Sequence, residues 1–386
     1  MSTTTRRIIT SSIVFSAIFF FVLSALELPL SAKVTGPCAN CHTMHNSQNG
    51  SPVARTGTGT GWNGSNQLAG GTVQTTPLGT LLTTDCVGCH TSTGSAPIVS
   101  LAGNDVPIVY NMTAPSTTLA GGNFHWVAQG GAENHKKGHN VFNIAPQDLN
   151  LNSAPGANPA ACGDSTCHTT LAVSPGTNNY DRGGCQGCHV FTYHHENNNN
   201  TMSGVYRYLK GHGSSPTFPP LPSARRNITS FPDYVKGIGD SDWEYTKSAA
   251  DHNFYNGSNA VYTSNGAGLT NQKTVSAFCA GCHSVFHDEM GSGSPWLRHP
   301  SDKFLPQTGE YGGYNPVTSY STEAPVAWTN PATPARAEAV VMCLSCHRAH
   351  GSDQPDMLRW DYSAMNAGNG GAAAGKGCFT CHTGKD

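Results

Sequence analysis

Six copies of the pattern Cys-x-x-Cys-His run through this chain of 386 residues, and a seventh copy has two more residues between its cysteines. The strict copies begin at Cys38, Cys86, Cys185, Cys279, Cys343 and Cys378, and the long copy runs from Cys162 to His168. Two thiols at this spacing, followed directly by an imidazole, are the attachment signature of c-type haem. The sulfurs form thioethers with the porphyrin, and the imidazole binds the iron.

The seven motifs use all 14 cysteines of the chain. The predicted thioether positions are Cys38, Cys41, Cys86, Cys89, Cys162, Cys167, Cys185, Cys188, Cys279, Cys282, Cys343, Cys346, Cys378 and Cys381. The predicted proximal iron ligands are His42, His90, His168, His189, His283, His347 and His382. A zinc site would not require the adjacent histidine. The sequence therefore predicts seven covalently bound haem c groups, and a Cys162–Cys167 disulfide is the alternative for the long motif.

Of the 18 histidines, seven stand in motifs and eleven remain. This surplus favours a second histidine as the sixth ligand of each iron over methionine, which would raise the reduction potential. The distal candidates are His45, His139, His195, His212, His252, His287, His299 and His350. His194 is the alternative to its neighbour His195, and His125 and His135 are predicted not to bind iron.

Three distal candidates follow a proximal histidine closely in the sequence: His45 and His350 by three residues and His287 by four. On a helical turn such residues share one face, with about 5–6 Å between their Cβ atoms. Two histidines so placed cannot bind opposite faces of one porphyrin. Each of the three is therefore expected to bind a second iron, which would join neighbouring haems into a contiguous chain.

The composition predicts an irregular fold. Charged residues are 11% of the chain, against roughly 25% in ordinary globular proteins, and long amphipathic periods are scarce. We expect mostly irregular structure with few strands, short helical turns at the motifs, and an extended segment at 339–342. The chain has few residues per motif, so the haems would supply much of the core. Residues 33–386 are predicted to form a single heptahaem cytochrome c unit wrapped around a contiguous haem chain.

Residues 1–32 have the features of a secretory signal peptide. Arg6 and Arg7 precede a mostly apolar run over residues 8–26, and small residues near Ala32 offer a cleavage site. An uncleaved membrane anchor is the alternative, because the apolar run approaches spanning length. Export also suits covalent haem attachment, which takes place outside the cytoplasm. The net charge of −2, before any haem propionates, gives no electrostatic basis for binding nucleic acid.

Three stretches resemble a known family, the OmcS-like outer-surface multihaem cytochromes. They are residues 41–47, residues 296–302 and residues 343–362. The resemblance implies stacked haems with two histidine ligands each. It also implies head-to-tail polymerisation into an extracellular cytochrome filament, in which His45 would bind a haem of the neighbouring subunit.

The leading functional hypothesis is extracellular electron transfer by a filament-forming heptahaem cytochrome. Its partners would be further copies of the chain, other redox cytochromes and extracellular electron acceptors. One alternative is a periplasmic multihaem reductase, which would need an iron with an open position. The other is a monomeric periplasmic electron carrier. Because there are enough histidines to close every iron, we expect an electron-transfer protein without catalytic residues, and not an enzyme.

Overall fold

The computed structural model describes residues 34, 38, 41–45, 47–48, 81–82, 85–101, 104–151, 153–156, 171–174, 183–189, 194–195, 202, 205–209, 234–259, 273–283, 286, 298–368 and 375–385, and the backbone of five short strands between residues 51 and 73. The predicted signal peptide at 1–32, the long motif from Cys162 to His168, His212 and His287 lie outside the described residues. Two compact units are present: Met1–Thr35 with Tyr193–Asn197, and Gly36–Thr192 with Asn198–Asp386. The elements below belong to the second unit.

The helices of the described residues are short, as the composition predicts. The α-helices are α2 (Cys86–Cys89), α3 (His125–Ala128), α4 (Ala132–His135) and α6 (Val275–Ala280). The 3-10 helices are η3 (Gly184–Gly187), η4 (Tyr206–Tyr208), η9 (Gly309–Tyr311), η10 (Arg336–Glu338), η11 (Cys343–Ser345), η12 (Pro355–Met357), η13 (Tyr362–Ala364), η14 (Gly377–Thr380) and η15 (Thr383–Lys385). Five of these helices contain or adjoin a Cys-x-x-Cys-His motif: α2, η3, α6, η11 and η14.

Most strands of the described residues form two-stranded ladders. Antiparallel pairs join β1 (Ser47–Gln48) with β2 (Ser51–Pro52), β3 (Arg55–Thr56) with β6 (Thr72–Val73), and β4 (Gly61–Trp62) with β5 (Leu68–Ala69). The longest hairpin pairs β8 (Ile98–Leu101) with β9 (Asn104–Pro107). A parallel pair joins β7 (Thr91–Ser92), directly after the second motif, with β10 (Tyr110–Asn111).

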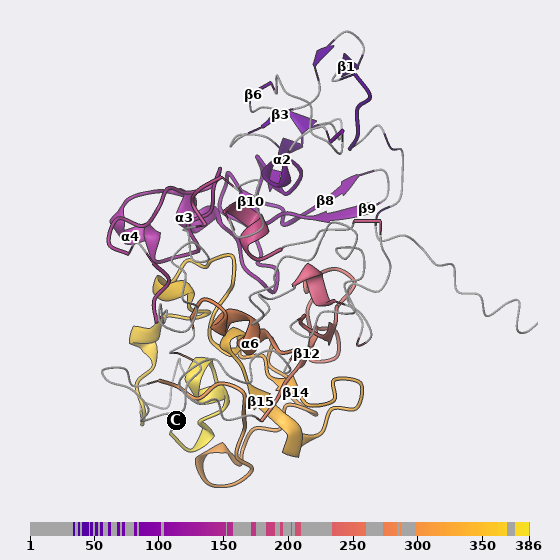
Figure 1. Ribbon diagram of the computed structural model, residues 1–386. Coiled ribbons are helices and arrows are strands. Elements are labelled where there is room, and N and C mark those ends of the chain that lie inside the picture. Colours follow the sequence, from indigo (N-terminus) through magenta and orange to yellow (C-terminus); the bar gives the residue numbers. More distant parts are fainter. Residues whose placement is uncertain are drawn as a thin grey trace, which may run out of the picture. The chain divides into compact units, whose positions relative to one another are not determined.

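One larger sheet lies in the C-terminal half of the chain (Figure 1). Its five strands stand in the order β11 (Gly237–Ile238), β12 (Phe254–Asn256), β14 (Ala327–Trp328), β15 (Ala339–Val341) and β13 (Lys303–Phe304). The β12–β14 pair is parallel and the other pairs are antiparallel. Strand β15 covers most of the extended segment expected at 339–342 and leads directly into Cys343.

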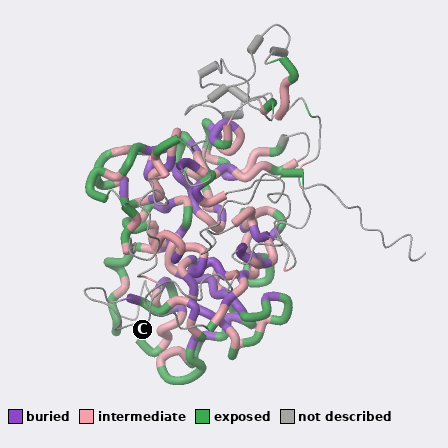
Figure 2. The backbone as a smooth tube through the Cα atoms, in the orientation of Figure 1, coloured by how far each residue is buried: buried purple, intermediate pink, exposed green. Residues whose placement is uncertain are grey.

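Apolar side chains gather in small clusters, and motif cysteines pack against them. One cluster joins α6 to the larger sheet through Val275, Tyr255 and Val340, with Cys279 at its edge. Figure 2 shows this sheet region as buried. A second cluster unites α2 with α3, and Cys185 packs against it. The attachment motifs therefore border the packed parts of the fold, where apolar burial stabilises their backbone.

No described helix is long and apolar enough to cross a membrane.

Candidate haem-binding site

Each of the six strict motifs closes one tight backbone turn. The histidine N–H donates to the carbonyl oxygen of the first cysteine, with N···O distances of 2.8–3.1 Å in all six. Caps fix the start of two helices that carry motif cysteines, α2 and α6: the Asp85 carboxylate accepts from the Gly88 N–H at 3.1 Å, and the Thr274 hydroxyl accepts from the Ala277 N–H at 3.0 Å. The turn brings both thiols and the imidazole of a motif close together, as attachment to one porphyrin requires.

The surroundings of the thiols suit an uncharged sulfur. The cysteines of the strict motifs are all free thiols in this structure. Burial raises the pKa of Cys188 and Cys346 to about 12 and that of Cys381 to about 11. Burial opposes the charged thiolate. A thioether carries no charge and meets no such penalty, so these positions fit covalent haem attachment.

The proximal imidazoles are oriented by backbone carbonyls. The Nδ1 atoms of His90, His189, His283 and His347 lie 2.7–3.1 Å from the carbonyl oxygens of Pro107, Arg207, Pro155 and Asp356, respectively. A carbonyl oxygen only accepts, so Nδ1 carries the proton in each ring. The lone pair then resides on Nε2, where it can bind iron.

Three distal candidates have the same arrangement. Nδ1 of His139 donates to the Ala349 carbonyl at 2.7 Å, Nδ1 of His252 to Asn253 at 2.8 Å, and Nδ1 of His299 to Pro300 at 3.0 Å. Burial lowers the pKa of His139 to about 4, and it lowers that of the proximal His189 to about 4 as well. The His139 and His189 rings are therefore neutral near pH 7, which is the metal-binding form of imidazole.

Three pairs of histidine rings face each other across the site. The ring centres of His139 and His283 are 6.2 Å apart, those of His189 and His350 are 6.3 Å apart, and those of His299 and His382 are 6.2 Å apart. An imidazole nitrogen binds a metal ion at about 2 Å, so two rings on opposite sides of one ion have centres roughly 6 Å apart. Each pair joins one proximal histidine to one distal candidate, and the separations fit an iron between them.

His350 faces a motif other than its own. It follows His347 by three residues, yet its ring lies opposite His189. Gly121 leaves room for this ring, since a Cβ atom on that residue would lie 3.1 Å from Nδ1 of His350. The ring of Phe124 packs beside it at 5.0 Å.

The remaining described candidates have other surroundings. His252 is buried, and its ring stacks on Tyr320 at 3.5 Å and lies beside Phe254 at 4.2 Å. His45 is exposed, next to Met44, which is 80% exposed. His194 and His195 are both exposed and lie in the other unit.

The two histidines predicted not to bind iron are both buried. Nδ1 of His135 accepts the Leu149 N–H at 3.0 Å, which places the ring proton on Nε2 and leaves no lone pair there. His125 donates from Nδ1 to the Asn111 carbonyl at 2.8 Å, and the Gln129 amide lies 3.4 Å from its Nε2.

Thiol contacts place the strict motifs in a row. The Cys86 and Cys185 side chains are hydrogen-bonded, and so are those of Cys279 and Cys343. Other pairs are close enough to interact electrostatically: Cys41 with Cys89, Cys188 with Cys282, and Cys346 with both Cys378 and Cys381. The six strict motifs therefore follow one another in sequence order. The spacing of the motifs along the chain gave no sign of these contacts.

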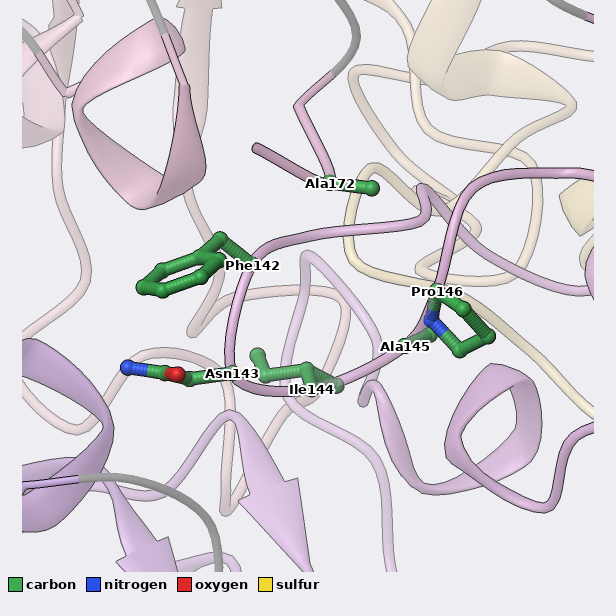
Figure 3. Close-up of a pocket in the computed structure, with 6 residues that line it drawn as sticks. All are labelled: Phe142, Asn143, Ile144, Ala145, Pro146 and Ala172. Atoms are coloured by element: carbon green, nitrogen blue, oxygen red, sulfur yellow. The ribbon is translucent and has the colours of Figure 1, made fainter. Parts of the chain in front are cut away.

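A shallow depression lies beside this row of motifs (Figure 3). It is lined by Phe142, Asn143, Ile144, Ala145, Pro146 and Ala172. The Asn143 amide anchors its wall to the Asp85 carboxylate, the helix cap of the second motif, at 2.9 Å. Its lining offers neither an imidazole nor a thiol, so the depression is not itself an attachment site.

Comparisons with known proteins match the attachment motifs and most of the chain. A family model described as a doubled CXXCH motif matches residues 334–386, which hold the last two motifs. C-type cytochrome OmcS of Geobacter sulfurreducens is 26% identical, over 84% of this chain and 78% of its own length. Two solved structures from that organism also match with a TM-score of 0.47. The first, an outer membrane cytochrome S filament, is 19% identical, and the match covers 87% of this chain and 86% of the filament chain. The second, the OmcS nanowires, is 20% identical, and the match covers 85% of this chain and 84% of the nanowire chain. The predicted resemblance to the OmcS-like multihaem c-type cytochromes is confirmed.

Proposed function

We propose that this chain is an exported, filament-forming multihaem c-type cytochrome that transfers electrons outside the cell. The observation that carries the proposal is the row of six strict motifs, in which cysteines of successive motifs lie near enough to interact. Long-range electron transfer requires an uninterrupted row of redox cofactors. Isolated metal sites do not require such a row.

The residues of the site have separate tasks. The cysteine pairs anchor each cofactor, and the carbonyls that accept from Nδ1 hold each imidazole with Nε2 toward the metal. Haem supplies, when bound, a one-electron iron couple. The facing pairs His139–His283, His189–His350 and His299–His382 would each supply two imidazoles to one haem iron. A closed site has no position for a substrate, which favours electron transfer over catalysis.

The proposal extends to further positions of the chain. It includes seven haems, with the long motif at Cys162, Cys167 and His168 attaching one of them, and a signal peptide at 1–32. His45, His195, His212, His252 and His287 are proposed as further distal ligands. Other redox cytochromes and extracellular electron acceptors are the proposed partners.

Polymerisation is proposed from the similarity to OmcS and from the surroundings of the first motif. His45 is exposed beside the first motif, so a neighbouring subunit could reach it. A head-to-tail contact that does not close produces a filament. If His45 bound an iron of the next subunit, the interface would contain a metal–nitrogen bond.

Two measurements on the exported protein test the proposal. Intact mass is expected to show the polypeptide with seven covalently bound haems, and electron micrographs of the purified material are expected to show filaments. Monomeric particles would contradict polymerisation while leaving a carrier function open. A high-spin ferric signal would contradict the closed axial sites.

His45 has its own test. His45→Ala is expected to shorten or abolish the filaments and to open one axial position, seen as a high-spin signal in the monomer. Met44→Ala is the matched control, because it removes an exposed neighbour that is not a proposed ligand. Long filaments with an unchanged haem spectrum in His45→Ala would remove His45 from the interface.

A further inference from the structure

The histidine of the last motif hydrogen-bonds to a carboxylate. Nδ1 of His382 lies 2.8 Å from Oε1 of Glu310. The four proximal histidines described above donate instead to neutral backbone carbonyls. A hydrogen bond to an ionised acceptor is roughly twice as strong as one between neutral groups. The surroundings of His382 are thus electronically different from those of the other four.

Contacts between η9 and η15 hold Glu310 in place. The Thr383 hydroxyl donates to the Glu310 carbonyl oxygen at 2.8 Å. The Lys385 ammonium lies 3.1 Å from Oε2, the carboxylate oxygen that His382 does not use. The two segments pack so closely that a Cβ atom on Gly384 would lie 2.9 Å from Cα of Glu310.

A half-buried arginine fixes the loop that carries Glu310. The guanidinium of Arg336 donates to the carbonyl oxygens of Leu305, Pro306, Tyr311 and Tyr314 at 2.7–3.2 Å. These carbonyls flank Glu310 on both sides in the sequence. The Arg336 hydrogen bonds therefore hold the loop backbone in the position from which the Glu310 carboxylate reaches His382.

We propose that Glu310 is a positioning residue for His382 and that it lowers the reduction potential of the haem attached at Cys378 and Cys381. A carboxylate acceptor raises the basicity of a ligating imidazole. A more basic ligand and a nearby negative charge both favour ferric over ferrous iron. The inference rests on the proposed function, because it requires a haem on this motif.

Lys385 makes the inference sharper. Its positive charge partly offsets the negative charge of the Glu310 carboxylate, so it reduces the amount by which Glu310 lowers the reduction potential. Removing Glu310's charge and removing that of Lys385 should therefore shift the potential in opposite directions. A purely structural role would not produce opposite shifts, since either substitution would only loosen the same contact between η9 and η15.

The experiment is a potentiometric titration of the full-length holoprotein, followed by haem absorbance. In Glu310→Gln the amide oxygen still accepts from His382 without the charge, and one component is expected to shift to higher potential. In Lys385→Gln one component is expected to shift to lower potential. Glu133→Gln is the control, because Glu133 is exposed and pairs with the exposed Lys136, and its titration should match that of the wild type.

Unchanged titrations in both variants, or shifts in the same direction, would overturn the inference. Mass analysis of the C-terminal peptide separates this result from a failure of the proposed function, because a peptide without haem on Cys378 and Cys381 would contradict the function itself. If the Glu310→Gln variant is produced without its haems, the Lys385→Gln variant decides alone. A shift of one component to lower reduction potential then supports the inference, and any other result refutes it.

Discussion

At the scale of single residues, the backbone group beside Nδ1 decides which ring nitrogen of His135 and of His139 is free to bind iron. His135 and His139 are about one helical turn apart in the sequence; His135 is buried and His139 is half-buried. Nδ1 of His139 donates to a carbonyl, whereas Nδ1 of His135 accepts from an N–H. The two rings therefore carry their protons on opposite nitrogens, and only His139 presents an unprotonated Nε2.

This difference predicts opposite outcomes for two matched substitutions. His139→Ala should open one axial position and give a high-spin signal from one haem, whereas His135→Ala should leave the haem spectrum unchanged. His139→Met should keep six ligands and raise the potential of that haem. Electron paramagnetic resonance and a redox titration measure these effects. A high-spin signal in His135→Ala, or none in His139→Ala, would contradict the proposed pairing with His283.

The sequence predicts the site residues unevenly, for a physical reason. Motif ligands are local, so their spacing identifies them. Distal histidines were identified only as candidates, because the pairing of His350 with His189 depends on how distant segments pack. The role of Glu310 left no signal in the sequence, since a lone glutamate far from His382 has no pattern around it.

At the scale of elements, buried polar side chains hold the short pieces together. Asn123 connects β10 to α3. Its amide donates to the Ile108 carbonyl at 3.2 Å and to the Asn111 side chain at 2.7 Å. Its oxygen accepts from the backbone N–H groups of Asn111 at 3.1 Å and His125 at 2.9 Å. This buried network, in which every polar group has a hydrogen-bond partner, holds short elements together in a fold that has no long described helices.

Asn123→Ala should therefore destabilise the protein strongly. It leaves buried donors and acceptors unpaired, and we expect a loss of about 2–4 kcal/mol in the free energy of unfolding. Guanidinium unfolding followed by Soret circular dichroism measures it. The exposed Asn330→Ala is the control, with an expected change within about 0.5 kcal/mol. Equal midpoints for the two variants would show that the network contributes little.

The elements themselves were predictable only where the motifs impose them. The turns at the motifs and the extended segment before Cys343 follow from the sequence. The five-stranded sheet does not, because strands such as β11 and β14 are two residues long and show no alternation. Their pairing is set by the packing of residues far apart in the chain.

At the scale of the whole molecule, the row formed by the six strict motifs connects the second motif directly to the fourth. The Cys86 and Cys185 side chains are in hydrogen-bond contact, so the second and fourth motifs are direct neighbours. The long motif lies between them in the sequence but is not needed to join them in space. A haem attached at Cys162 and Cys167 would then be a branch of the electron path and not one of its links.

This arrangement predicts different outcomes for removing two motifs. Cys162→Ser with Cys167→Ser should lose one haem by intact mass, yet films of the purified protein should keep nearly the wild-type conductance. Cys185→Ser with Cys188→Ser should also lose one haem, and here the conductance should fall steeply, because the gap lies between the second and fifth motifs. Each variant loses one haem, so each serves as the control for the other. If removing the long motif lowered the conductance as much as removing the fourth, the path would have to run through the long motif, and the thiol contact between Cys86 and Cys185 would not mark a step in it.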